Sequence, residues 1–528
     1  MGAQRHSIKR QVVELTLADS RDTWRLQQEL GRIYRQRLVP LIERDCDELS
    51  TPDCLYRLER LELDLGTIDI DHLESELVAK VSAQLKPRLA EQIERQERSS
   101  SAPDDRPEVL SQLELFSQFI HYGSLPWWAD LRQPRLLADN LHYLLRYAPV
   151  RLRSLLSTLI REKRNRQRLI RHYDDAQLTA LATLLVPGLE TFLTRLLPAL
   201  VELLTVQRLG VPARLKYAVW SEVLQLVSRQ RENYQEMRTY DRAWADIAYP
   251  DTGNSEFLSF GRELLRRVAR NLGLSYPDLL AGLRQTSKPA TVAIQEDLTP
   301  LIVALERDSG EESTAIAVRS VAKSANVPPA RRNGRKETTF APDRWPVPSE
   351  LTADDRDIMD DTAEEVYLDT AGLVLLWPFL GRFFERLGLL AAERFKDATA
   401  VQRAVGLLHY LATEETEPPE YRLPLAKVLC GMEPEAVFLL ETPLSAEEMK
   451  ECTLLLSAVI EHAPILRNMS IAGFRGTFLL RHGILGQRDG AWLLRVERET
   501  YDIVLERFPW TVNWVKLPWM TAPLRVEW

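Results

Sequence analysis

The chain has 528 residues, of which 45% are hydrophobic and 27% are charged. This balance is typical of a water-soluble globular protein, and the length predicts several domains instead of a single core. The formal net charge of -8 disfavours a nucleic-acid-binding protein, which is usually basic overall, so we expect no nucleic-acid partner.

The N-terminal region alternates between strand and helix patterns. Val13–Leu17 alternates apolar and polar residues, which predicts a first strand. Leu26–Leu38 then has apolar residues at helical spacing, and Pro40 is expected to kink or end that helix. Tyr56–Leu65 alternates again, and Leu73–Ile93 is a long amphipathic run. The order of these patterns predicts a β-α-β-α unit.

The middle of the chain predicts many short helices. Its amphipathic runs are interrupted by prolines, which cannot continue the hydrogen bonding of a helix. These prolines are Pro126, Pro134, Pro149, Pro187, Pro198 and Pro212. We therefore expect a central bundle or solenoid of short helices, and not one long rod. From about residue 286 the pattern gives way to stretches rich in Ser, Pro and Arg, which are typical of a disordered linker.

The C-terminal region predicts a helical domain that ends in strands. Ser445 with Glu448 matches a capping box at the start of a helix. Later runs alternate apolar and polar residues, as half-buried strands do. These runs are Trp492–Val496, Tyr501–Leu505, Val512–Trp514 and Leu524–Trp528. The whole chain is thus expected to be mainly α, with α+β terminal regions.

The predicted domain boundaries follow these changes of pattern. We expect a β-α-β-α N-terminal domain over residues 1–98 and a helical central region over 108–285. A flexible linker is expected over 286–360. It is followed by a C-terminal helical domain with terminal β-strands over 361–528.

The apolar residues and cysteines predict neither a membrane segment nor a secreted protein. Met1–Arg10 is polar and basic with no apolar run after it, so we expect no signal peptide. No stretch of about 18 uninterrupted apolar residues occurs, so we expect no stable membrane insertion. The cysteines form no CxxC pair, which disfavours a zinc ribbon or a redox motif and favours reduced thiols.

No constellation of residues predicts catalysis. The chain contains no HExxH, P-loop, GxSxG or GxGxxG motif, and its histidines are dispersed. The nearest grouping is His462 with His482, near Asp489 and Cys452, which could act as an acid–base pair. Structural or surface histidines are the favoured interpretation. We expect no enzyme, no cofactor and no metal site.

Two sets of residues are candidate partner contacts. The candidates are Arg151, Arg153, Arg164 and Arg168 in a dense basic run, and Trp510, Trp514, Trp519 and Trp528 near the C-terminus. The basic run could meet a phosphate or an acidic protein surface, and a solvated helix face is the favoured alternative. The tryptophans could form an aromatic ligand platform, although core filling or a protein interface explains them better.

Several blocks of sequence resemble those of a known family. They are Leu58–Gly66, Gly123–Trp128, Gly372–Leu380, Glu420–Gly431 and Ser470–Trp528. On these blocks the chain resembles the contractile injection system tape-measure family. The C-terminal blocks are the most specific, and the similarity covers about residues 1–130 and 360–528.

The resemblance implies a structural component of an extracellular phage-tail-like particle, in which a tube lies within a contractile sheath on a baseplate. Such a protein occupies the tube lumen during assembly and sets the length of tube and sheath. The implied partners are inner-tube, hub and baseplate proteins. The implied location is the cytoplasm during assembly and then the tube lumen of the particle.

The residues leave other roles open. A fully helical chain of 528 residues would span roughly 790 Å, and residues 98–362 about 400 Å, yet the prolines count against one continuous helix. The alternative is a baseplate or cap assembly factor, or a chaperone for the tube, that does not set length. A cargo effector is disfavoured because no catalytic constellation is present.

Overall fold

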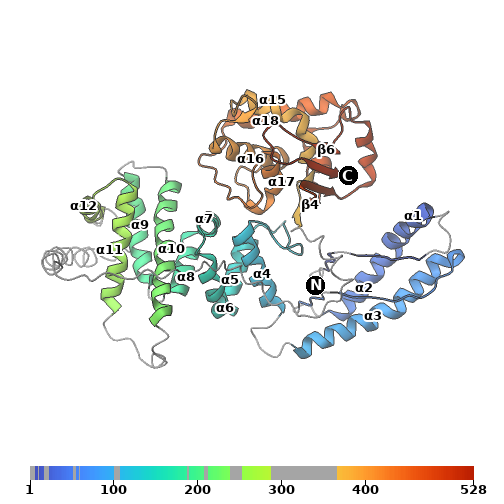
Figure 1. Cartoon of the computed structure of the whole chain (residues 1–528), viewed down its shortest axis with the longest axis horizontal. Coiled ribbons are helices and arrows are strands. Elements are labelled where there is room, and N and C mark those ends of the chain that lie inside the picture. The colour runs from blue at the N-terminus through green and yellow to red at the C-terminus, as the bar shows by residue number, and fades with distance from the viewer. Residues whose placement is uncertain are drawn as a thin grey trace, which may run out of the picture. The chain divides into compact units, whose positions relative to one another are not determined.

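The computed structural model describes residues 6–9, 11–16, 23–50, 55–58, 60–99, 107–131, 133–186, 189–206, 212–237, 253–286 and 365–528 (Figure 1). The chain divides into two compact units. The first comprises Met1–Phe119 and Leu125–Leu155, and the second comprises Ile120–Ser124 and Leu156–Trp528. Among the described residues, helices occur in both units and strands only in the C-terminal region. The expected fold class, mainly α with α+β terminal regions, is confirmed in its helical character and in its strand-bearing C-terminal region.

The predicted linker and the expected absence of membrane insertion are taken next. The flexible linker predicted over 286–360 lies outside the described residues apart from Thr286, the last residue of a helix. Across the described ranges, no helix has the length and apolar character needed to cross a membrane.

The first unit is built around a helical hairpin. The helices that begin in this unit are α1 (Thr23–Ile33), η1 (Tyr34–Leu38), α2 (Val39–Leu49), η2 (Ile70–His72), α3 (Leu73–Ser99), α4 (Pro107–Tyr122), α5 (Leu136–Tyr147) and α6 (Pro149–Leu159). On α3 an apolar residue recurs at every fourth position, which makes one stripe along the helix. The stripe consists of Leu73, Leu77, Val81, Leu85 and Leu89, all buried against residues of α1, η1 and α2.

The helix that contains Pro40 is not broken there. The preceding segment η1 is a π-helical turn, in which the Val39 N–H donates to the Tyr34 carbonyl five residues earlier. Proline lacks an N–H and its ring crowds the preceding turn, and a wider turn relieves both problems. The chain therefore continues directly into α2, with Pro40 in the first turn.

The predicted N-terminal strands are not formed in the described residues. No strand is assigned to the described residues of Val13–Leu17 or Tyr56–Leu65. The alternation of apolar and polar residues in the second segment still decides which side chains face the core. Leu61, Leu63 and Leu65 are half-buried and pack against the core of this unit. A side chain takes the place of a neighbouring strand at one carbonyl, since the Gln84 amide donates to the Asp64 oxygen at 2.7 Å.

Prolines account for the short helices of the middle region. Pro107, Pro149 and Pro212 are the first residues of α4, α6 and α10. At that position the missing N–H has no helical partner to lose. Pro198 is the exception, because it lies inside α9.

The central helices of the second unit form a packed array. They are α7 (Lys163–His172), α8 (Asp175–Leu185), α9 (Leu189–Val206), α10 (Pro212–Met237), α11 (Gly253–Asn271) and α12 (Tyr276–Thr286). From α8 to α12 each helix contacts the next one, and α10 also contacts α7; Figure 1 shows α9, α10 and α11 side by side. The Asp174 side chain accepts from the Gln177 N–H and closes a capping box at the start of α8. The expected series of packed helices is confirmed in the described residues.

The C-terminal region combines short helices with strands. Its helices are η5 (Ala371–Leu376), α15 (Trp377–Arg386), α16 (Ala398–Thr413), η6 (Glu420–Arg422), α17 (Pro424–Leu429), α18 (Ala446–His462), η7 (Pro464–Leu466), α19 (Ile471–Phe474), η8 (Arg475–Leu479) and η9 (Thr500–Arg507). Its strands are β1 (Val366–Leu368), β2 (Leu390–Ala391), β3 (Arg394–Phe395), β4 (Gly483–Arg488), β5 (Ala491–Val496), β6 (Trp514–Val515) and β7 (Leu524–Glu527). The capping box expected at Ser445 and Glu448 is confirmed at the start of α18.

The main sheet has five strands in the order β1-β4-β5-β7-β6. β4 and β5 form an antiparallel hairpin, and β5 pairs with β7 in parallel. The hairpin turns at Asp489 and Gly490, whose φ angles of 51° and 74° suit the tight turn that joins twisted strands. The strands predicted in Trp492–Val496 and Leu524–Trp528 are confirmed as β5 and β7. Tyr501–Leu505 was wrongly predicted as a strand, because it lies within the 3-10 helix η9.

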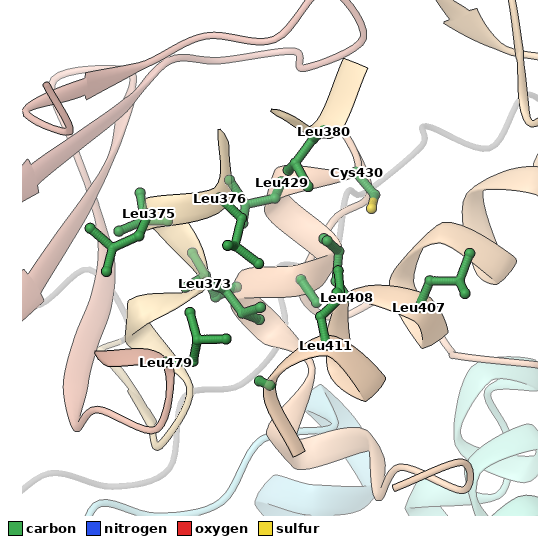
Figure 2. Close-up of a cluster of buried hydrophobic side chains, with 14 of the residues drawn as sticks. Leu373, Leu375, Leu376, Leu380, Leu407, Leu408, Leu411, Leu429, Cys430 and Leu479 are labelled. Carbon is green, nitrogen blue, oxygen red and sulfur yellow. The ribbon is translucent and has the colours of Figure 1, made fainter. Parts of the chain in front are cut away.

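The core of the C-terminal region lies between the sheet and its helices. Figure 2 shows part of this cluster, in which leucines of η5, α15, α16 and α17 converge. Leu376, Leu380, Leu408 and Leu411 are completely buried. Backbones also approach closely here, because a Cβ added at Gly372 would lie 1.7 Å from the Phe478 carbonyl oxygen.

Gly372→Ala should therefore destabilise the protein. The methyl group cannot be accommodated without moving the η8 backbone, and such overpacking costs about 1–3 kcal/mol or more. Gly381→Ala on α15 is the matched control, because a Cβ there meets nothing within 4 Å. It should be neutral or stabilise by up to about 1 kcal/mol through the higher helix propensity of Ala. Thermal unfolding followed by circular dichroism measures both changes, and equal midpoints for the two variants would contradict the close approach.

Candidate functional site

The basic run predicted as a partner contact is divided by the fold. Arg151 and Arg153 lie on α6 in the first unit, where Arg151 is half-buried and Arg153 exposed. Arg164 and Arg168 lie on α7 in the second unit. The Arg164 side chain is 52% exposed and its guanidinium lies 3.5 Å from the carboxylate of Glu435. Arg168 is completely buried, so the run is not one continuous basic surface.

Arg168 is completely buried and makes several hydrogen bonds. Its Nε donates to the Glu420 carboxylate at 3.1 Å, and its Nη1 donates to the carbonyl of Ile120 at 3.0 Å. The carbonyls of His121 and Glu435 accept further hydrogen bonds from the same guanidinium. One side chain thus joins three segments of the second unit that are far apart in sequence.

Glu420 compensates two buried cations. Its Oε1 atom accepts from Arg168 and also from Lys427 Nζ at 3.0 Å. Lys427 donates in addition to the Pro434 carbonyl at 2.8 Å. His172 approaches the second carboxylate oxygen, with its Nε2 at 3.5 Å from Oε2. We call Arg168, His172, Glu420 and Lys427 the buried charge cluster.

The electrostatics of the cluster follow from one carboxylate serving two cations. Burial alone would raise the pKa of Glu420, but the charges of Lys427 and Arg168 and the nearby His172 ring outweigh it and hold the pKa at about 2. Burial lowers the pKa of Lys427, which the single carboxylate only partly offsets. Burial also lowers the pKa of His172, so its neutral form is favoured. The carbonyl oxygens around Arg168 and Lys427 help to stabilise the surplus positive charge.

Gly123 makes room for the cluster. Its φ of +76° is a left-handed conformation that glycine adopts without strain, and an added Cβ would lie 2.7 Å from Glu420 Oε1 and 2.9 Å from Arg168 Nε. Gly123, Glu420 and Lys427 all fall within the sequence blocks that resembled a known family. That was the one signal by which the sequence could have pointed to the cluster, because nothing in the local pattern distinguishes Arg168 from its exposed neighbours.

A second buried ion pair closes the C-terminal end of the fold. Arg481 and Asp502 meet through two hydrogen bonds, of 2.8 Å and 2.7 Å. The Arg481 guanidinium also lies over the rings of Tyr501 and Trp528, 5.4 Å and 5.5 Å from their centroids. Asp502 belongs to the run Tyr501–Leu505, where a strand would have placed this polar residue on the solvent face, so the pair was not predicted.

The tryptophans predicted as partner contacts occupy two kinds of position. Three of them donate their indole N–H to groups of the same region. These bonds run from Trp510 to the Leu375 carbonyl at 3.1 Å, from Trp519 to the Leu429 carbonyl at 2.8 Å, and from Trp528 to the Asp502 carboxylate at 3.0 Å. Trp514, on β6, is 57% exposed. The four residues therefore do not form one aromatic platform.

The structure places the residues of the candidate acid–base grouping in separate environments. His462 packs edge-on to Phe379, with ring centroids 5.7 Å apart, whereas His482 and Asp489 are exposed. Burial raises the pKa of the Cys452 thiol to about 12, which makes it a poor nucleophile. In the part of the chain that is described, no three His, Cys, Asp or Glu residues are placed to hold a metal ion. What the buried charge cluster can do is hold distant segments in one arrangement.

The fold and the buried charge cluster together define a mainly helical protein whose distant segments are joined by buried ion pairs. The family model for the contractile injection system tape measure protein matches residues 5–528, so the chain belongs to that family. No curated protein and no solved structure matches the chain. The resemblance inferred from the two ends is confirmed, and it extends through the middle. The family is structural, with a role in tail length and association with other particle proteins, and is not an enzyme family.

Glu420→Gln should strongly destabilise the second unit. The substitution leaves two cations buried without a counter-charge, and breaking a buried pair in this way costs about 3–5 kcal/mol. Glu435→Gln removes the same charge from a neighbouring exposed pair with Arg164 and should change stability by less than about 1 kcal/mol. Urea unfolding followed by tryptophan fluorescence compares the two variants. Similar midpoints for both would show that the cluster does not contribute as described.

Acidification should weaken the same unit through Glu420. The pKa of about 2 in the folded chain lies below the ordinary value of 4.5. The stabilisation is therefore complete above about pH 5 and is lost as the pH falls toward 2, because the unfolded chain then binds the proton more tightly. Unfolding midpoints measured from pH 7 to pH 3 should converge for the wild type and Glu420→Gln. A difference that stays constant with pH would refute an ionised Glu420.

Proposed function

We propose that this chain is the tape measure of an extracellular contractile injection system and sets the length of tube and sheath by the span between its two ends. The observation that carries the proposal is the family match, which runs through the ends and the middle of the chain together. The central helices supply the material of a spacer. The packed C-terminal region, with its sheet and buried ion pairs, is suited to docking at one end.

The buried charge cluster bears directly on how such a ruler would work. Arg168 and Glu420 are 252 residues apart in sequence yet in hydrogen-bond contact. In a continuous helix the same separation would be about 380 Å at 1.5 Å per residue. The two arrangements exclude each other. On this proposal the described structure is the closed form, and the chain opens the cluster when it extends in the tube.

The expected partners remain inner-tube, hub and baseplate proteins, reached first in the cytoplasm and then in the tube lumen. Arg151, Arg153, Arg164 and Trp514 are the proposed contacts in the closed form, because these side chains are at least partly accessible. Arg168 is completely buried and is available to a partner only after the chain opens, whereas the half-buried Trp510, Trp519 and Trp528 already use their indole N–H groups within the C-terminal region.

A second function is favoured by the same cluster. A chain held compact by a buried ion pair suits a baseplate or cap assembly factor, or a chaperone of the tube, which need not extend. Such a factor would leave particle length unchanged. A chaperone would also be absent from purified particles.

Deletions between residues 290 and 360 test the length proposal, because they leave the described helices and strands intact. Each deletion of 20 residues should shorten the particles by about 30 Å if the spacer is helical, and by more if it is fully extended. Lengths are measured in electron micrographs of purified particles, and an immunoblot establishes that the chain is present. A scrambled segment of unchanged length is the control and should give particles of normal length. Particles that contain the shortened chain but keep the original length would overturn the ruler and favour an assembly factor.

A further inference from the structure

The extended residues 60–65 of the first unit have the side-chain pattern of a strand. Half-buried leucines alternate there with exposed charged residues. The leucines are Leu61, Leu63 and Leu65, and the charged residues are Arg60, Glu62 and Asp64. Such alternation is the geometry of a strand with one face on a core and the other in solvent. We call residues 60–65 the pairing segment.

The main chain of the pairing segment is not used in a ladder. Among the described residues, no backbone–backbone hydrogen bond involves residues 60–65. A second extended segment of the same unit, residues 11–16, does not supply one, because its side chains are all exposed and no backbone hydrogen bond joins it to the pairing segment. A row of unpaired N–H and C=O groups along a strand is a template for another strand.

The order of the exposed charges identifies a second copy of this chain as the strand that fits. An antiparallel pair with a two-fold axis at Leu61 places Arg60 of each copy opposite Glu62 of the other. Both of these cross-strand pairs are then oppositely charged, which stabilises strand pairing. The two side chains are 69% and 68% exposed, so both are accessible to a second copy.

The other symmetric registers bring like charges together. An axis at Arg60 or at Glu62 places that residue opposite itself, and an axis at Leu63 places Glu62 opposite Asp64 of the other copy. A parallel pair in register would also place each charge beside its own copy. Like charges directly opposite destabilise a strand pair. Registers shifted by a single residue are excluded as well, because they would bring a leucine opposite a solvent-facing residue.

We propose that the pairing segment is a homodimer interface, in which it pairs antiparallel with the same segment of a second copy across Leu61. The dimer forms the ladder that the sequence pattern predicts and that the described part of a single chain does not form. The interface is short, so the association is weak and reversible. The inference concerns the association of the chain with itself and does not depend on whether the chain measures length.

Charge-reversed variants of the full chain test the register. Arg60→Glu and Glu62→Arg each bring like charges together in the homodimer and should weaken self-association at least about tenfold. An equimolar mixture of the two variants should restore it, because one chain then offers two carboxylates to the two guanidinium groups of the other. Sedimentation equilibrium over a dilution series measures the mass, which is 60.7 kDa for the monomer. Arg88→Glu and Glu91→Arg, at an exposed pair on α3, are the matched controls and should leave association unchanged.

Hydrogen exchange locates the contact. Amides of residues 60–65 should exchange freely in the dilute chain and become protected as the dimer forms, while those of residues 11–16 should not change. Recovery in the mixture excludes misfolding of either variant as the cause of its weaker association. A wild-type chain that stays monomeric at about 100 µM, where even a small interface associates, would overturn the proposal. So would single variants that keep the dimer, a mixture that does not restore it, or protection that occurs only in assembled particles, which would place a strand of another subunit there.

Discussion

The carboxylate of Glu420 is the feature on which the arrangement of the second unit depends. It is completely buried, and it is the counter-charge that both Arg168 and Lys427 contact. Moving ions out of water costs several kcal/mol each, so the three groups are tolerated only together. An apolar trio of similar volume could be equally stable, but it would accept many packings. The ionic trio adds directional hydrogen bonds that connect α7 to η6 and α17.

The sequence predicted the elements whose pattern is local. The stripe on α3, the capping box of α18 and strand β5 follow from spacing over a few turns or residues. The strand predicted over Tyr501–Leu505 is wrong because alternation of apolar and polar residues over five positions does not require a strand. Asp502 is the reason: it is buried, it pairs with Arg481, and it accepts from the Glu499 N–H. A short polar residue that bonds backward to the chain favours a turn of helix over a strand.

The candidate contacts show where local reasoning ends. Arg168 has the same sequence surroundings as Arg164, yet one is buried and the other 52% exposed. The difference arises from Glu420, 252 residues away, and no periodicity reveals a partner at that distance. The tryptophans likewise differ in their surroundings, and partners distant in sequence cause the difference. The indole N–H groups of Trp510 and Trp519 donate hydrogen bonds to backbone carbonyls of η5 and α17. Core filling, the favoured interpretation, describes these two residues, while Trp514 alone has the exposure of an interface residue.

On the proposed ruler function the chain is compact before assembly and extended in the tube, and opening the buried charge cluster is one energetic cost of that change. Opening it costs on the order of 3–5 kcal/mol if the ions separate without new partners, and less if water reaches them. An interface of standard size can supply a surplus of that order. Glu420 and Lys427 belong to the C-terminal region, so a partner bound to that region would hold one side of the cluster in place. Extension of the rest of the chain would then move α7 away from η6. The contact of Arg168 with Glu420 would break while the C-terminal core stays folded.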